Sequence, residues 1–195
     1  MHEAERIIRD EHRSIAAVLH GLIFQMREVT ERGAPPDFKV LKAMLDYIVS
    51  FPEQLHHPKE EEYLFAALRR RDPQAAGMLA ALEAEHVTGD ELIRALQESL
   101  LAYEKEGAVK AQAFREAVEE YADFHWQHMR REEDELLPWA NKALTSQDWE
   151  AVGRAFKEND DPLFGIKPKE EFERLFSRIV EITPPPIGLG SPTHH

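Results

Sequence analysis

The sequence predicts an all-α protein, an up-down-up-down four-helix bundle followed by one or two short C-terminal helices. Apolar residues recur at spacings of three and four in four long segments, as the buried face of a bundle helix requires. Short runs containing proline or glycine separate these segments. Only nine of the 195 residues are glycine, and the strongest helix formers dominate the composition.

The first two helices are expected on either side of the break at residues 32–37, "RGAPPD". The first carries one apolar face in which a histidine, His12, fills a vacant position; the other members of that face are Ile8, Ile15, Leu19, Leu22, Met26 and Val29. The second helix is predicted from about Phe38 to Arg71. We expect bends at Pro52 and Pro58, because proline removes a helical hydrogen bond.

The third and fourth helices are expected after "RDPQ" at 71–74, with Gly107 between them. The face of the third comprises Leu79, Leu82, His86, Gly89, Ile93, Leu96 and Leu100. The face of the fourth comprises Phe114, Val118, Tyr121, His125, His128, Glu132, Glu135 and Trp139. Both faces therefore place polar residues where a bundle normally buries apolar ones.

The pattern weakens after Ala143. Thr145 or Ser146 could cap a short helix that uses Trp149, Val152 and Phe156. A last helix, with its apolar face between residues 172 and 179, would close the bundle or form a homodimer contact. We therefore divide the chain into a bundle at 1–143, a helical extension at 144–182 and a disordered tail at 183–195.

Composition excludes several classes of function. The net charge of −13 disfavours nucleic acid as a partner. The absence of cysteine excludes disulfides, thiolate metal ligands and a cysteine nucleophile. The N-terminus lacks the apolar region of a signal peptide, and no run approaches the length of a membrane span. We predict a soluble cytoplasmic protein without a membrane partner.

A repeated motif carries the functional prediction. "EHRS" from Glu11 precedes "HHPKEEEYLF", and "EHVT" from Glu85 precedes "HMRREEDELLP". The first histidine lies 44 residues before the second in one repeat and 42 in the other. A single His-x-x-x-Glu pair is weak evidence, since a solvated helix face explains it equally well. Two repeats, each with a histidine on one helix and His-x-x-x-Glu on the next, instead predict a paired metal site.

Helical register selects the residues of this site. Counting back from the apolar residues that end each motif favours His56 with Glu60 over His57 with Glu61. We expect the His57 side chain to point about 100° away, toward the helix flank. The predicted metal ligands are His12, His56, Glu60, His86, His128 and Glu132. Two metal ions with bridging carboxylates suit this set; the alternative is a metal-free polar network.

Other residues near the motifs carry two interpretations. His125 lies one turn before His128 and could be a ligand or a support for one, although a core histidine is favoured. Asp90 is expected to face water, and Gly89 to leave room for a small ligand or for close packing. Glu61 and Glu133 are expected to be solvated or to support the ligands.

With these motifs, residues 3–143 resemble the hemerythrin-like, or HHE cation-binding, family. The resemblance implies a four-helix bundle with a non-haem di-iron centre, and Glu60 and Glu132 would bridge the two irons. Oxygen-carrying members have a second histidine where this chain has Asp90, and His-x-x-x-x-Asp in the last helix. The carboxylate-richer set here is more similar to the iron–sulfur repair and iron-sensing branches, although the cysteine-bearing domain usual in the repair proteins is missing.

The resulting functional prediction is a di-iron protein that senses, binds or reacts with oxygen, nitric oxide or peroxide during oxidative or nitrosative stress. An iron or zinc storage or delivery protein is one alternative. A di-iron enzyme, such as a peroxidase, oxidase or nitric oxide reductase, is another. Zinc or manganese would also suit these ligands, because metal availability often decides occupancy.

Overall fold

The computed structural model describes residues 1–159; the predicted helix at 172–179 and the predicted tail at 183–195 lie outside the described residues. The elements are α1 (Glu3–Arg32), α2 (Phe38–Ile48), η1 (Val49–His56), α3 (His57–Lys59), η2 (Glu60–Phe65), α4 (Ala66–Arg71), η3 (Pro73–Ala75), α5 (Ala76–Glu106), η4 (Gly107–Lys110), α6 (Ala111–Arg131), η5 (Glu132–Leu136), α7 (Leu137–Ala143) and α8 (Ser146–Lys157).

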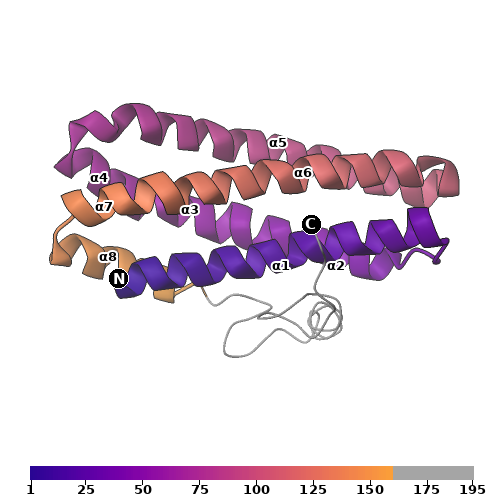
Figure 1. Cartoon of the computed structure of the whole chain (residues 1–195), viewed down its shortest axis with the longest axis horizontal. Helices are drawn as coiled ribbons and strands as arrows, with labels where there is room; N and C mark the ends of the chain where they lie inside the picture. Colours follow the sequence, from indigo (N-terminus) through magenta and orange to yellow (C-terminus); the bar gives the residue numbers. More distant parts are fainter. Residues whose placement is uncertain (160–195) are drawn as a thin grey trace.

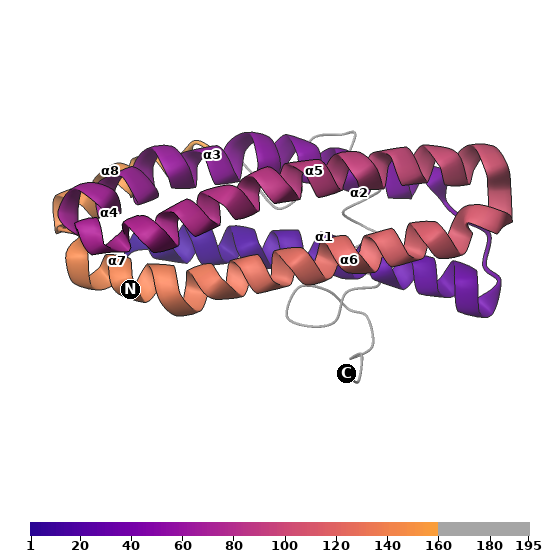
Figure 2. The ribbon, with the colours of Figure 1, turned by 90° about the horizontal axis from the view of Figure 1, so that it is seen from above.

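These elements form four antiparallel rods, and the all-α bundle is confirmed (Figure 1). One rod is α1, the second runs from α2 to α4, the third is α5, and the fourth runs from α6 to α7. Figure 2 shows the four rods side by side along the same axis, with α8 at the end where α1 begins. Within residues 1–159 there is no strand, and no helix has the length and apolar character needed to cross a membrane.

The turns between rods follow from local chemistry. Gly33 ends α1 with a φ of 69°, and Gly107 follows α5 with a φ of 77°, both in the region that favours glycine. Asp37 accepts a hydrogen bond from the backbone N–H of Val40 and so caps α2. The breaks predicted from sequence therefore lie where the rods end.

Three segments of the second and fourth rods are π-helical: η1, η2 and η5. Pro52 lies inside η1, which accounts for the irregularity expected there. A π turn adds a residue and changes which side chains face inward. From the end of η5 onward the buried positions are Leu136, Leu137 and Ala140, whereas Glu135 is exposed. The predicted register at Glu135 is therefore wrong by the added residue.

The core has two apolar clusters with a polar layer between them. One includes Leu19, Leu45 and Phe114 and lies toward the α1–α2 turn. The other includes Ile8, Leu82 and more C-terminal residues of the fourth rod. The repeated histidines and glutamates occupy the layer between the two clusters.

Helix α8 packs against α1 and η2. Thr145 and Asp148 form a capping box at its N-terminus, as the sequence predicted for Thr145. Trp149, Val152 and Phe156 are buried on its inner face. The division of the chain at residues 143 and 182 stays a prediction.

Candidate metal centre

Four rods bring the predicted ligands together in the polar layer. His12 comes from α1, His56 and Glu60 from the second rod, His86 from α5, and His128 with Glu132 from the fourth; all six are at most 7% exposed. Each His-x-x-x-Glu pair lies on one helix face, one turn apart. Their role as ligands stays a prediction, but the geometry on which it depends is present.

Glu60 and Glu132 lie at the centre, surrounded by histidine Nε2 atoms. The nearest Nε2–carboxylate distances are 3.3 Å from His12 to Glu132, 3.4 Å from His56 to Glu60, 3.5 Å from His86 to Glu60, and 3.5 Å from His128 to Glu132. All four rings therefore present the same nitrogen to the two carboxylates.

The opposite nitrogen of each ring contacts an outer carboxylate. The Nδ1–oxygen distances are 3.0 Å from His12 to Glu133, 2.7 Å from His56 to Glu11, 2.7 Å from His86 to Glu61, and 2.8 Å from His128 to Glu85. An ionised carboxylate can only accept, so each Nδ1–H donates and each Nε2 keeps a lone pair for a cation. Carboxylates in this position also orient the ring and strengthen it as a ligand.

Several buried atoms at the centre need a partner that residues 1–159 do not supply. Both oxygens of Glu60, both oxygens of Glu132, and Nε2 of His86 and of His128 have no hydrogen-bond partner. Nε2 of His12 lies 3.2 Å from Nε2 of His56, so either a proton or a cation must lie between the two nitrogens. Unpartnered buried polar atoms are costly, and a cation between them would satisfy them.

The donor atoms form two compact groups that share one residue. His12, His56, Glu60 and Glu132 form one group, and His57, Glu60, His86 and His128 form the other. The atoms of each group lie within 4.8 Å of one another. The residues thus fit two metal positions, with the Glu60 carboxylate common to both.

His57 therefore lies in the centre, whereas the sequence analysis predicted that its side chain would point toward the helix flank. It is 5% exposed, and its ring stacks on that of His86 at a centroid distance of 4.3 Å. Its Nδ1 donates to Glu53 at 3.2 Å, the arrangement of the other four histidines. The expectation was wrong because the second rod buries a wide face here: His56 turns toward α1, and His57 toward α5 and α6.

The central charges shift one another's protonation when no cation is present. Burial alone would lower the pKa of His86, but Glu132 and Glu60 raise it to about 10. Burial and the neighbouring Glu60 would raise the pKa of Glu132, but the adjacent histidines lower it to about 2. The proton on His86 thus takes the place of a cation, and a metal must displace it.

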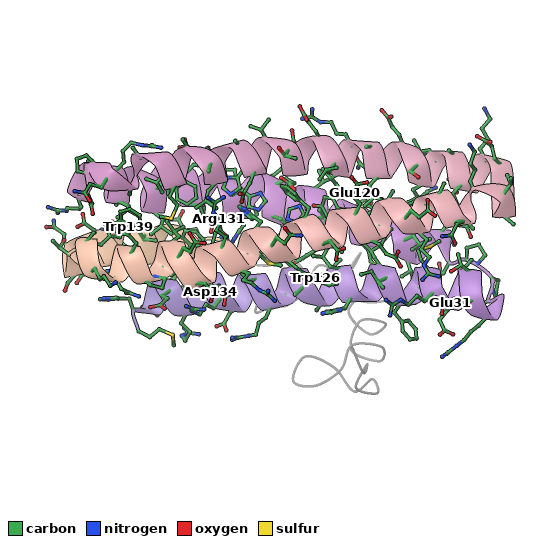
Figure 3. The ribbon with its side chains drawn as sticks, turned by 45° about the horizontal axis from the view of Figure 1, so that its top comes forward. Glu31, Glu120, Trp126, Arg131, Asp134 and Trp139 are labelled. Carbon is green, nitrogen blue, oxygen red and sulfur yellow. The ribbon has the colours of Figure 1, made fainter. Side chains whose placement is uncertain are left out.

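Two cavities flank α6 and reach the histidines. A cavity of about 380 Å³ between α5 and α6 is lined by His128, Glu85, Phe124 and Arg131, among others. A second, of about 600 Å³ between α1 and α6, is lined by His12, His20, Trp126 and Met129, among others. Figure 3 shows Arg131 on the side of α6 that faces α5, and Trp126 on the side that faces α1.

The remaining residues singled out from the sequence lie around this centre. His125 is buried between Tyr121 and His57 but belongs to neither donor group. Burial, with the nearby His128 and His86, lowers the pKa of His125 to about 3. Gly89 faces the His125 ring rather than an ion position, and Asp90 pairs with Arg94 at the surface.

Three supporting carboxylates were given no role from sequence: Glu11, Glu85 and Glu53. The signal for two of them was present, since a glutamate precedes the histidine in both "EHRS" and "EHVT". Glu53 precedes His57 by one helical turn, so its role could be seen only after His57 was placed at the centre.

Comparison with known families gives one result over most of the bundle. The profile of the "Hemerythrin HHE cation binding domain" matches residues 4–140. The match includes every histidine and glutamate of the two donor groups and ends before α8. No curated protein matched the chain.

Proposed function

The chain belongs to the hemerythrin HHE cation-binding family, and we propose that it holds two iron ions that bind or react with oxygen, nitric oxide or peroxide. The family match and the two donor groups indicate a domain that could hold metal. The iron identity, the number of ions and the small-molecule ligand are proposals.

The pair of donor groups sharing Glu60 is the observation that carries the proposal. Imidazole and carboxylate donors without thiolate suit iron, and also manganese or zinc. A shared carboxylate holds two ions close enough to act on one small ligand. When bound, a pair of iron ions supplies electron transfer to or from such a ligand.

The residues around the candidate ion positions orient the histidines, enclose the centre and supply the ligands. The five outer carboxylates hold each Nδ1–H, which fixes the tautomer and directs each Nε2 inward. The two apolar clusters enclose the centre along the bundle axis. His57, His86 and His128 would hold one ion, and His12, His56 and Glu132 the other, with Glu60 between them.

The cavities beside α6 favour exchange with a small molecule over simple storage. Both contact a candidate ligand, His128 in one and His12 in the other. A small molecule in either cavity would therefore lie next to a candidate ligand. An enzyme would use the same cavities, but would in addition turn over repeatedly with a reductant.

Elemental analysis of untagged protein, combined with its visible spectrum before and after nitric oxide or peroxide, tests the proposal. We expect about two irons per chain and an iron-dependent spectrum that changes with the added molecule. Steady turnover with a reductant would identify the enzyme alternative. Iron that a chelator removes at once, with no spectral response to either molecule, would identify storage or delivery. A folded chain without bound metal would overturn the proposal.

A further inference from the structure

Helix α8 lies beyond the matched residues 4–140, yet the chain that follows it reaches the metal centre. Asn159, 4% exposed, donates through Nδ2 to both carboxylate oxygens of Glu11, at 2.9 Å and 3.2 Å. The same carboxylate accepts the Nδ1–H of His56 at 2.7 Å. A buried series of contacts thus runs from Asn159 through Glu11 to His56.

Three further contacts hold the segment from Ala155 to Asn159 in place. Its backbone N–H donates to the carbonyl of Phe156 at 3.1 Å, which closes the end of α8. Lys59, three residues after His56, donates to the carbonyl of Ala155 at 2.6 Å. The ring of Phe156 covers His56 edge-on at a centroid distance of 5.8 Å. Asn159 is therefore held by the same segment that covers the ligand.

The equivalent position in the other repeat is built differently. Glu85 accepts from His128 but pairs with Arg131, and the Glu85 side chain is 25% exposed beside a cavity. A guanidinium shares the negative charge of its carboxylate, whereas a neutral amide leaves that charge directed at the histidine. The Glu11 side chain is only 8% exposed. Its carboxylate therefore interacts more strongly with His56 than the Glu85 carboxylate does with His128.

We propose that Asn159 is a positioning residue of the metal centre, which fixes Glu11 and so holds His56 in its ligand orientation. This inference rests on the proposed metal-binding function. It assigns the chain after the matched domain a direct part in retaining the ion on the His12–His56 side. Loss of an outer hydrogen-bond partner commonly weakens metal binding by about 10- to 100-fold.

The test compares Asn159→Ala with Val152→Ala in the full chain. Val152 is buried on the inner face of the same helix, but it belongs to the apolar cluster rather than to the series of contacts ending at His56. It therefore reports loosened packing alone. Two quantities are measured: the rate at which each of the two ions is lost to a chelator, and the solvent exchange of the His56 Nδ1–H proton, followed by proton NMR of the cobalt-loaded chain.

Because Asn159 acts on His56 through Glu11, we expect Asn159→Ala to speed release of one of the two ions by up to about tenfold, the lower end of the range of about 10- to 100-fold, and to accelerate exchange of the His56 proton. Val152→Ala should change neither by more than a small factor. Equal effects of the two variants, or an Asn159→Ala chain that matches wild type while wild type holds two ions, would overturn the inference alone. A wild-type chain without metal would overturn both this inference and the proposed function.

Discussion

His56 and His128 occupy equivalent places in the two repeats, but their surroundings differ. Each ring directs Nε2 toward a glutamate four residues later, and Nδ1 toward the glutamate that begins the "EHRS" or "EHVT" motif on the other helix of its repeat. His56 is closed off by Phe156 and Asn159, whereas His128 borders a cavity of about 380 Å³. The repeat thus gives both rings the same orientation, whereas α8 covers only His56.

The two central glutamates give the largest expected contrast. Glu60 belongs to both donor groups and Glu132 to only one. We expect Glu60→Ala to reduce the metal content from about two ions per chain to nearly none, because both positions lose a ligand. Glu132→Ala should keep the ion held by His57, His86 and His128. Elemental analysis of both variants distinguishes them, and equal metal contents would show that the carboxylates serve the two positions alike.

The adjacent histidines of the second rod separate the two positions. His56→Ala should empty the position that includes His12 and His56, and His57→Ala the position that includes His57, His86 and His128, so each variant should hold about one ion. The double variant should hold none. Since His56 faces α1 and His57 stacks on His86, the two losses should be additive. A His57→Ala chain that still binds two ions would restore the assignment made from sequence alone.

Proton competition provides a third contrast. His86 in the metal-free chain has a pKa of about 10, against 6.5 for an ordinary histidine. Between pH 6.5 and about 10 it therefore keeps a proton that an ordinary histidine would lose. Apparent zinc affinity should therefore rise by about tenfold per pH unit for each proton displaced. The same proton stabilises the metal-free fold fully below pH 6.5, and this contribution is lost as the pH rises through 10. Competition titrations at several pH values measure the slope; affinity independent of pH would contradict it.

The smallest expected effect concerns the packing of Gly89 against His125. A Cβ at Gly89 would lie 3.3 Å from two atoms of the His125 ring, which Tyr121 and His57 hold in place. Gly89→Ala should lower the free energy of unfolding by about 1 kcal/mol, despite the better helix propensity of alanine. Gly77→Ala, where nothing lies within 4 Å, should instead raise it by up to about 1 kcal/mol. Urea unfolding of the metal-free variants gives both values.

The bundle could be predicted from sequence because its signals are local. Apolar spacing identified the rods, and residues such as Gly33 and Gly107 identified their ends. The six predicted ligands come together because the i, i+4 spacing fixes each His–Glu pair and the repeat fixes how the pairs oppose each other.

The features missed from sequence depend on distant contacts or altered helical geometry. Asn159 lies 148 residues from Glu11, and no local pattern links the two. His57 was misplaced because a regular helix would turn it outward, whereas here the second rod buries both adjacent rings. Glu135 was misplaced because η5 adds a residue to the turn.

The distance along the chain between Glu11 and Asn159 also bears on folding during synthesis. Helix α1 precedes the other described elements in the sequence, but it packs mainly on α6 and α8, which lie in the last third of residues 1–159. His12 therefore acquires its contacts with Glu132 and Glu133 only when most of the described chain has been made. Contacts so far apart in sequence form slowly, so we expect the complete pair of donor groups to form late in folding.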